Sequence, residues 1–292
     1  MNSAPSKTTQ LQRPPRRFSR ARLGLSKVVE GTARWLGGRA SYRRRHLARG
    51  RFLVREEVLA IPGLPAGLDG FTTVHWSDLH AGPFLREGDL AEVVAATAEL
   101  QPDLVALTGD LITHSWEEAL LLADDLGSLR ATYGVLGVFG NHDYKGRREG
   151  DIAAALEARG VRFLRNRAER LDTGDGVLAV VGLEDVEEGR GADLEHARSQ
   201  LQPDDVELVL CHNPLSAPQL VRAGCAAVLS GHSHGTQIDL PYLRRCGPAH
   251  PGTRLCLGPT TLIVSRGLGV VALPVRIGAP SEIVVLRLEA RA

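Results

Sequence analysis

Five short clusters of Asp, Asn and His residues are the part of this 292-residue sequence best suited to chemistry. Each cluster directly follows an aliphatic or β-branched run that has the length of a strand. Ligands of α/β proteins bind at the carboxyl ends of strands, so we expect the five clusters to meet in one place. In chain order they are Ser77-Asp78-Leu79-His80, Gly109-Asp110, Gly140-Asn141-His142-Asp143, His212-Asn213 and Gly231-His232-Ser233-His234-Gly235.

The side chains in these clusters form a mixed set of oxygen and nitrogen ligands. Asp78 and His80 are two positions apart, as are His232 and His234, so in extended backbone each pair points to one face. Such sites suit Mn, Fe, Zn or Co better than Mg or Ca, which prefer all-oxygen shells. One metal takes about four to six ligands, so seven ligands with one bridging carboxylate suit two divalent ions. The seven candidates are Asp78, His80, Asp110, Asn141, His212, His232 and His234.

Two metal ions about 3.5–4 Å apart are a common arrangement for phosphoryl chemistry. One ion lowers the pKa of a bound water, and both neutralise charge that builds on the phosphate oxygens. We therefore predict a metal-dependent hydrolase of phosphate esters. A metal-binding protein without turnover is the alternative, and the complete ligand set argues against it. The adjacent Gly109, Gly140, Gly231 and Gly235 are expected to let the backbone turn tightly and approach the metals.

The elements that must position these clusters are strands that alternate with helices. This alternation implies parallel pairing, and the scarcity of helices between the later strands predicts a mixed sheet. Runs typical of strands are Phe71–Trp76, Leu104–Thr108, Val135–Phe139, Val177–Val181, Val206–Leu210, Ala226–Leu229, Thr261–Val264 and Ile283–Leu288. Helix candidates are Glu87–Leu100, Trp116–Leu129 and Asp151–Arg159. We assign residues 51–292 to this body and residues 1–50 to a separate arm.

The arm is strongly basic. Residues 1–50 carry thirteen Lys or Arg and one acid, Glu30, so the arm is near +12 and the rest of the chain, given a total of +1, near −11. Residues 1–17 have the composition of a disordered segment. From about Leu23 to Leu47, spaced apolar residues fit an amphipathic helix on an anionic membrane surface. A solvated basic tail fits equally well, and nucleic-acid binding is a third, weaker interpretation.

Other features of the sequence indicate where in the cell the protein is located. No run of 18 apolar residues occurs, so no transmembrane helix is predicted. The four cysteines lack CxxC spacing, which favours reduced thiols in a cytoplasmic protein, with a Cys246–Cys256 bridge left open. Arg16-Arg17-Phe18 is similar to part of a twin-arginine export signal, but no apolar h-region follows it. We expect a cytoplasmic protein with peripheral membrane contact, in preference to an exported one, and predict no protein partner.

Together the five clusters resemble the calcineurin-like metallophosphoesterase superfamily, whose motifs are Asp-x-His, Gly-Asp, Gly-Asn-His-Asp/Glu, His and Gly-His-x-His. The resemblance covers about residues 70–240. Four flanking segments are also similar to a bacterial branch of UDP-2,3-diacylglucosamine pyrophosphatase-type and cell-envelope phosphoesterases, namely residues 61–65, 76–80, 211–214 and 265–269. The resemblance implies an α/β fold, a four-layer α/β/β/α sandwich with mixed sheets. It also implies that metal-bound hydroxide attacks a phosphodiester, pyrophosphate or phosphomonoester, and the branch and the basic arm together favour a lipid-linked or envelope substrate.

The resemblance also assigns roles to individual residues. It implies one metal held by Asp78, His80 and His234, and a second held by Asn141, His212 and His232, with Asp110 bridging both. His142 would stabilise the phosphate or protonate the leaving alkoxide as a general acid, and Asp143 would orient its imidazole. Many relatives have an acid three residues after the bridging Asp, where this chain has Thr113. We expect that difference to affect tuning or substrate contact, without loss of the metals.

Other polar residues are weaker candidates. His75 should point away from Asp78 and lie in the core or at the surface, and His114 could line the pocket. The acids between Glu184 and Glu188 are expected to form an exposed loop that binds no metal. Four cations could hold a substrate phosphate, although solvated charge is an equal alternative: Lys145, Arg147, Arg148 and Arg266.

Overall fold

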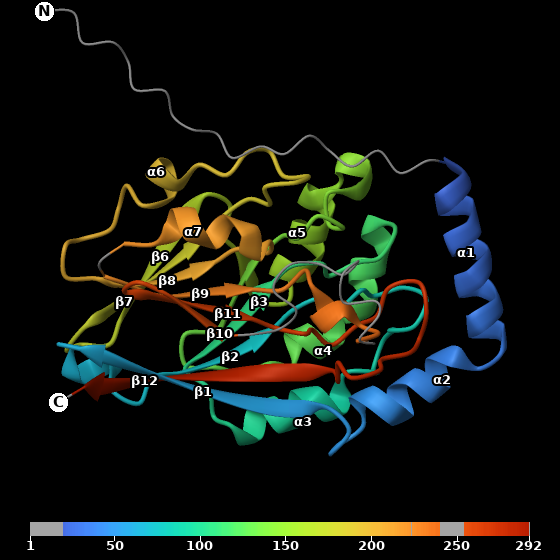
Figure 1. Cartoon of the computed structure of the whole chain (residues 1–292), viewed down its shortest axis with the longest axis horizontal. Helices are drawn as coiled ribbons and strands as arrows, with labels where there is room; N and C mark the ends of the chain where they lie inside the picture. Colours follow the sequence, from blue (N-terminus) through green and yellow to red (C-terminus); the bar gives the residue numbers. More distant parts are fainter. Residues whose placement is uncertain (1–19, 223, 240–253, 292) are drawn as a thin grey trace, which may run out of the picture.

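The computed structural model describes residues 20–222, 224–239 and 254–291, and the side chains from residue 27 onward. The strands of these ranges form two six-stranded sheets that lie against each other (Figure 1). The first sheet has the order β1 (Leu53–Pro62), β12 (Glu282–Arg291), β2 (Thr72–Trp76), β3 (Leu104–Thr108), β4 (Val135–Val138) and β5 (Val161–Phe163). The second has the order β10 (Arg254–Leu257), β11 (Thr260–Val264), β9 (Cys225–Ser230), β8 (Val206–Leu210), β7 (Val177–Gly182) and β6 (Arg167–Asp172).

Both sheets mix parallel and antiparallel pairs. In the first sheet β2, β3, β4 and β5 are parallel, while β12 is antiparallel to β2 and parallel to β1. In the second sheet β7, β8, β9 and β11 are parallel, and β6 and β10 are antiparallel strands at the two edges. The parallel strands therefore place their carboxyl ends along one edge of each sheet, which is where the polar clusters follow in the sequence.

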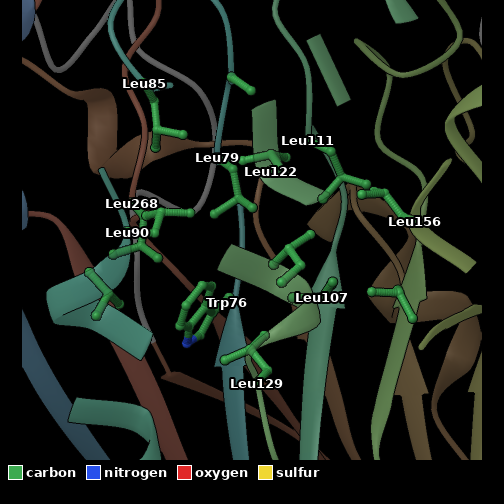
Figure 2. Packing of buried hydrophobic residues seen from close by; sticks show 14 of the residues in the cluster. Trp76, Leu79, Leu85, Leu90, Leu107, Leu111, Leu122, Leu129, Leu156 and Leu268 are labelled. Carbon is green, nitrogen blue, oxygen red and sulfur yellow. The ribbon is translucent and has the colours of Figure 1, made fainter. Parts of the chain in front are cut away.

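Apolar clusters separate the four layers. The middle cluster joins the two sheets, and it takes Leu104 and Ala106 from β3. The alternate residues of the same strand, Val105 and Leu107, belong to a cluster under helices, so both faces of β3 are buried. Figure 2 shows this second cluster around Trp76, with Leu107 and Leu129 close by. A third cluster covers the outer face of the second sheet. The predicted α/β/β/α sandwich is confirmed.

Helices cover the outer faces of both sheets. On the first sheet lie α3 (Ala91–Glu99), the 3₁₀ helix Trp116–Leu122, α4 (Ala123–Gly127) and α5 (Glu149–Glu157). On the second lie α6 (Leu194–Ala197) and α7 (Ala217–Leu220). Further 3₁₀ turns are Ala66–Leu68, Lys145–Arg147, Pro214–Ser216 and His234–Thr236. The single helix predicted from Trp116 to Leu129 is thus a 3₁₀ helix followed by a short α-helix.

The basic arm is helical where it is described, and it contacts the body. It contains α1 (Arg20–Trp35), α2 (Gly38–Tyr42) and a π-helical turn (Arg43–Leu47), with α1 ended by Gly37 at a φ of 81°. Tyr42 and Leu47 are buried in the cluster of the first sheet. The boundary at residue 50 stays a prediction, but the core of the body draws side chains from before it.

Some sequence predictions fall outside the described residues. These are the disordered segment 1–17, the arginine pair with Phe18, and Cys246. Cys211, Cys225 and Cys256 are free thiols. Within the described ranges, no helix combines the length and the apolar character needed to cross a membrane.

Candidate metal centre

The loops that carry the candidate ligands are held in an unusual backbone conformation. Five of the seven candidates have positive φ, with values of 51° at Asp78, 48° at His80, 51° at Asp110, 69° at His232 and 51° at His234. Extended backbone, which the two-residue spacing suggested, is therefore wrong at these positions. The side chains converge through left-handed turns, each of which costs a non-glycine residue about 1–2 kcal/mol. Strain of this kind persists where surrounding contacts enforce it, and it is typical of functional sites.

Apolar side chains and backbone hydrogen bonds enforce these turns. Leu79 and Leu111, each next to a candidate ligand, insert into the cluster under the helices (Figure 2). The two loops also pair with each other, because the backbone N–H of Asp78 donates to Gly109 O at 3.0 Å and that of His80 to Asp110 O at 3.0 Å. Apolar residues that alternate with polar ones thus anchor the loops while the polar side chains point to the site.

The first group of donors comprises Asp78, His80, Asp110 and His234, which are all buried. Each offers one ligand atom, and these atoms all lie within 4.8 Å of one another. The Nε2 atoms of His80 and His234 are 3.0 Å apart. His80 Nε2 lies 3.4 Å from Asp110 Oδ2, and His234 Nε2 lies 3.4 Å from Asp78 Oδ1. Converging ring nitrogens and carboxylate oxygens are the donor set of a divalent transition metal.

The second group comprises Asp110, His212 and His232, and its ligand atoms also lie within 4.8 Å of one another. His212 Nε2 is 3.4 Å from Asp110 Oδ2 and 3.2 Å from His232 Nδ1. Asn141 Oδ1 lies 3.0 Å from His232 Nδ1, which brings the seventh candidate to the same place. Asp110 belongs to both groups, and its Oδ2 faces a histidine from each.

The charges of the site suit a cation. Burial, together with the charge of Asp110, raises the pKa of Asp78 to about 6. Burial is the largest single influence on Asp110 and opposes its ionisation, but the attractions of His212, His142 and His80 together outweigh burial and lower the pKa of Asp110 well below its usual range. The attraction between Asp110 and His212 raises the pKa of His212 well above its usual range. Two buried carboxylates thus share a site in which positive charge is stabilising.

A chain of hydroxyl groups extends from Asp78 into the core. Ser77 Oγ donates to Asp78 Oδ2 at 2.6 Å, and Thr108 Oγ1 donates to Ser77 Oγ at 2.8 Å. His75 Nε2 lies 2.7 Å from Thr108 Oγ1, whose only proton is already used, so the imidazole must be the donor. His75 is buried away from the site, one of the two places predicted for it, and burial lowers its pKa to about 3. Its link to Asp78 was not predicted.

His142 lies beside the first group of donors. Its backbone N–H donates to Asp110 Oδ1 at 2.8 Å, and its ring meets that of His80 edge-on at 4.6 Å. Its Nδ1 lies 3.0 Å from Thr113 O and 2.6 Å from Lys145 Nζ, and that ammonium group also donates to Thr113 O at 2.7 Å. Burial lowers the pKa of His142 to about 4. Lys145 thus lies at the site, and Thr113 supplies the carbonyl that both side chains face.

Asp143 has a different role from the predicted one. Its carboxylate accepts hydrogen bonds from the backbone N–H groups of Gly140 at 2.8 Å, Leu111 at 2.8 Å and Ile112 at 3.1 Å. The prediction that it orients the imidazole of His142 is therefore wrong, because its two oxygens fix the backbone of two ligand loops. Burial and the charge of Asp110 raise its pKa to about 7.

Two of the predicted glycines lie where a side chain would collide with the site. A Cβ atom at Gly231 would lie 1.8 Å from Ser77 Oγ and 2.2 Å from Asp78 Oδ2. A Cβ atom at Gly140 would lie 2.4 Å from Asp110 Oδ1 and 2.8 Å from His212 Nδ1. Neighbouring loops therefore approach the donors as closely as the sequence suggested.

The weaker candidates make contacts of other kinds. His114 Nε2 lies 2.6 Å from the carboxylate of Glu30 in α1, so it joins the arm to the loop after β3. Arg147 donates to Glu188 O at 2.6 Å, and Arg266 pairs with Glu282 at 2.6 Å. Arg148 lies over the ring of Trp116, 4.9 Å from its centroid. Among these cations only Lys145 is placed against His142.

The acids after β7 are not an exposed loop, contrary to the sequence prediction. Glu184 and Asp185 are buried. Glu184 accepts from the Tyr144 hydroxyl and from Arg165 Nε at 2.7 Å, and Asp185 accepts from the backbone N–H groups of Glu187 and Glu188. Ion pairing of Glu184 and turn formation by Asp185 offset the free-energy cost of burying these carboxylates. A run of acidic residues in the sequence gives no sign of either interaction.

Comparisons with known proteins agree with this geometry. The sequence profile named Calcineurin-like phosphoesterase matches residues 71–236, which contain all five clusters. The chain belongs to this family. It is therefore a metal-dependent phosphoester hydrolase by membership, and a divalent-metal site is expected of it.

Individual relatives extend the likeness beyond the matched segment. The chain is 32% identical over 236 residues to "Uncharacterized metallophosphoesterase YkuE" of Bacillus subtilis, a match that covers 77% of this chain and 82% of that protein. It is 30% identical over 245 residues to "Transmembrane protein with metallophosphoesterase domain" of Bos taurus, covering 78% of this chain but 55% of that protein. It also resembles the crystal structure of TT1561 of Thermus thermophilus, with 15% identity, a TM-score of 0.46, and coverage of 68% of this chain and 90% of that one.

Proposed function

We propose that the chain hydrolyses a phosphodiester, pyrophosphate or phosphomonoester at a pair of divalent ions. The observation that carries this proposal is the position of Asp110, which belongs to both donor groups. One ion would be held by Asp78, His80 and His234, and the other by Asn141, His212 and His232. When bound, the ions would activate a water molecule and neutralise charge on the phosphate oxygens.

Asp110 is suited to act as the bridge. Its Oδ1 accepts the backbone N–H of His142 at 2.8 Å, which fixes the orientation of the carboxylate. Its Oδ2 then faces His80 and His212, each at 3.4 Å. His212 is fixed in turn, because its Nδ1 lies 2.7 Å from Thr108 O and leaves Nε2 for the site. The ligands on both sides of the bridge are therefore held before any ion binds.

His142 would supply the proton for the leaving oxygen. Its Nδ1 lies 3.0 Å from Thr113 O, a carbonyl that can only accept, so a protonated His142 would donate Nδ1–H to Thr113 and carry its second proton on Nε2. Transfer of that proton from Nε2 of the imidazolium to the departing alkoxide would leave a neutral imidazole, which is general acid catalysis. Lys145 also adds positive charge beside the position of the phosphate.

The ligand set bears on the identity of the ions, and the basic arm bears on the class of substrate. A mixture of imidazole, carboxylate and amide donors favours Mn, Fe, Zn or Co. We propose a lipid-linked or envelope phosphate ester as the substrate, because the described part of the basic arm lies against the loop that carries His114. A protein of about −11 outside its arm would otherwise repel an anionic surface.

The test is turnover after metal removal and reloading with Mn, with bis(p-nitrophenyl) phosphate and p-nitrophenyl phosphate as substrates. We expect metal-dependent turnover, two ions per chain by elemental analysis, and activity at background in Asp110→Asn with at most one ion retained. His196→Ala, a change at an exposed histidine on α6, serves as the control and should match wild type. Full activity with one ion per chain, or in Asp110→Asn, would contradict the paired-ion proposal. Bound metal without turnover of any ester, lipid-linked pyrophosphates included, would favour a protein without catalysis.

A further inference from the structure

The outward side of α1 exposes large apolar side chains. Val28 is 65% exposed, Trp35 84% and Leu36, just after the helix, 71%. Val28 and Trp35 are seven positions apart, so they lie on one side of the helix. Glu30 lies on the opposite side, buried against His114. The helix thus contacts the body through Glu30 and the small Ala33, and turns its large apolar residues Val28 and Trp35 to solvent.

A second exposed apolar segment lies next to the end of α1. Leu273 and Val275, between β11 and β12, are 39% and 40% exposed. Pro274 lies against Gly38, since a Cβ atom at that glycine would be 2.8 Å from Pro274 Cγ. Figure 1 shows α1 standing beside the segment that leads into β12. We call the combined surface the docking face, made of Val28, Trp35, Leu36, Leu273 and Val275.

The segment between β11 and β12 is held in place from beneath. Gln237 Nε2 donates to Val271 O and Leu273 O, each at 3.1 Å. The buried guanidinium of Arg276 donates to Gly269 O, Arg266 O and Ala279 O. Leu273 and Val275 are therefore exposed on a fixed backbone, and their exposure is a feature of the folded chain.

The surroundings of the docking face are basic. Lys27 and Arg34 are exposed on α1, and Arg44 and Arg45 are exposed on the π-helical turn that follows α2. Glu30 is the only acid between residues 1 and 50, and it faces the body. Apolar side chains bordered by cations are the pattern of a helix that lies in a membrane interface, where each basic residue near an anionic surface contributes about 1 kcal/mol.

We propose that the docking face lies on an anionic phospholipid membrane. A nucleic acid would use the arginines but gives no reason for five exposed aliphatic or indole side chains. Contacts connect this surface to the site, because Glu30 meets His114, and the carbonyl of the preceding Thr113 faces His142 and Lys145. Resting on the proposed function, this connection favours a phosphate ester whose lipid tail stays in the bilayer.

Vesicle sedimentation of the full chain tests the proposal. We expect wild type to bind phosphatidylglycerol vesicles more strongly than phosphatidylcholine vesicles, and Trp35→Glu/Leu36→Glu to bind at least tenfold more weakly. Trp35→Glu alone should also weaken binding, and its matched control is Leu120→Glu, which places the same single charge at an apolar side chain that is 52% exposed on another helix. Arg44→Gln and Arg45→Gln should each weaken binding about fivefold, and Arg287→Gln, an exposed arginine of β12, should not.

Trp35 provides a direct signal. Trp76 is buried and Trp116 half-buried, so a blue shift of tryptophan emission on adding vesicles should be lost in Trp35→Phe. Equal vesicle binding by wild type and Trp35→Glu/Leu36→Glu would overturn the proposal, and would assign binding to residues before the docking face. So would salt-sensitive binding to DNA that exceeds binding to vesicles and ignores these substitutions.

Activity separates this proposal from the proposed function. Trp35→Glu/Leu36→Glu should leave turnover of bis(p-nitrophenyl) phosphate unchanged and lower turnover of a vesicle-borne phosphate ester at least tenfold. If wild type hydrolyses no ester at all, the proposed function fails, while sedimentation still decides the docking face. If vesicle binding is lost but vesicle-borne and soluble esters are hydrolysed as before, the inferred lipid substrate is wrong.

Discussion

The loops that carry the candidate ligands, here called the floor of the site, lie near the docking face. The two regions differ in how exposed their side chains are and in how those side chains are held. The floor, formed by the loops after β2, β3, β4, β8 and β9, has mostly buried side chains, and hydrogen bonds from neighbouring loops fix the orientation of Asp110 and His212. The docking face consists of exposed side chains, and the helix that bears most of it meets the floor where Glu30 contacts His114. A substitution in the floor should therefore affect every substrate, whereas one in the docking face should affect only substrates held at a membrane.

Two glycine substitutions, one in the floor and one in α1, should give the largest difference in metal binding and activity between the two regions. Gly231→Ala would place a methyl group 1.8 Å from Ser77 Oγ and 2.2 Å from Asp78 Oδ2, so we expect loss of metal binding and activity. A Cβ atom at Gly31 in α1 would have no atom within 4 Å apart from the backbone of its own helix, so Gly31→Ala should stabilise the helix by about 0.5–1 kcal/mol without changing activity. Metal content, turnover and thermal unfolding of both variants check this. An active Gly231→Ala would mean that the loops of the floor can move apart.

Removing the imidazole of His142 should lower kcat by about 10²–10⁴-fold when the leaving group is an alkoxide. The loss should be much smaller with a p-nitrophenyl ester, because nitrophenolate departs without a proton. Metal content should remain that of wild type, since the side chain is not a proposed ligand. Steady-state kinetics of His142→Ala on an alkyl and a nitrophenyl diester make the comparison. Equal losses on both substrates would show that His142 acts on the phosphate instead of the leaving group.

The floor could largely be predicted, because each of its strands is followed directly in the sequence by the polar cluster that it positions. The run Leu104–Thr108 is bounded by Asp103 and Gly109, and β3 has the predicted bounds. The polar clusters at strand ends were likewise sufficient to bring seven candidate ligands together. By contrast β1 was missed, because Arg55, Glu56 and Glu57 interrupt the pattern expected of a strand. These charges are compatible with an edge strand, where Arg55 and Glu57 pair with each other and Arg55 with Glu282.

What could not be predicted depends on contacts between residues far apart in the chain. Asp143 was assigned to the adjacent imidazole, yet its oxygens bind backbone groups of the loop after β3. Glu184 was placed in solvent because its neighbours are acidic, but in the core Arg165 pairs with its charge and Tyr144 donates a hydrogen bond to it. The contact of Glu30 with His114 spans 84 positions and leaves no pattern in either segment. Sequence reasoning thus named candidate ligands that converge in the fold, and it failed on the partners that orient them.

The hydroxyl chain beneath the floor should have a moderate effect on activity. Thr108→Val keeps the shape of the side chain but removes the hydroxyl that connects His75 to Ser77, and Ser77 donates to Asp78. We expect metal affinity or kcat to fall by about 10–100-fold, the usual effect of removing a partner of a metal ligand. Thr108→Ser retains the hydroxyl and should keep most of the activity. If the two variants are equally impaired, packing at position 108 matters and the hydroxyl chain does not.

The smallest effect concerns pH and depends on burial of His75 beneath the floor. Its pKa is about 3 in the folded chain against 6.5 when exposed, so the folded state requires the neutral imidazole. Its contribution to stability is complete above pH 6.5 and is lost progressively as pH falls from 6.5 towards 3, which amounts to about 2 kcal/mol at pH 5. His75→Gln can still donate to Thr108 but does not titrate, so its urea unfolding should depend less on pH over this window. His196→Gln, at an exposed position, should follow wild type. Parallel pH profiles for wild type and His75→Gln would show that protonation of this residue does not limit the acid stability of the floor.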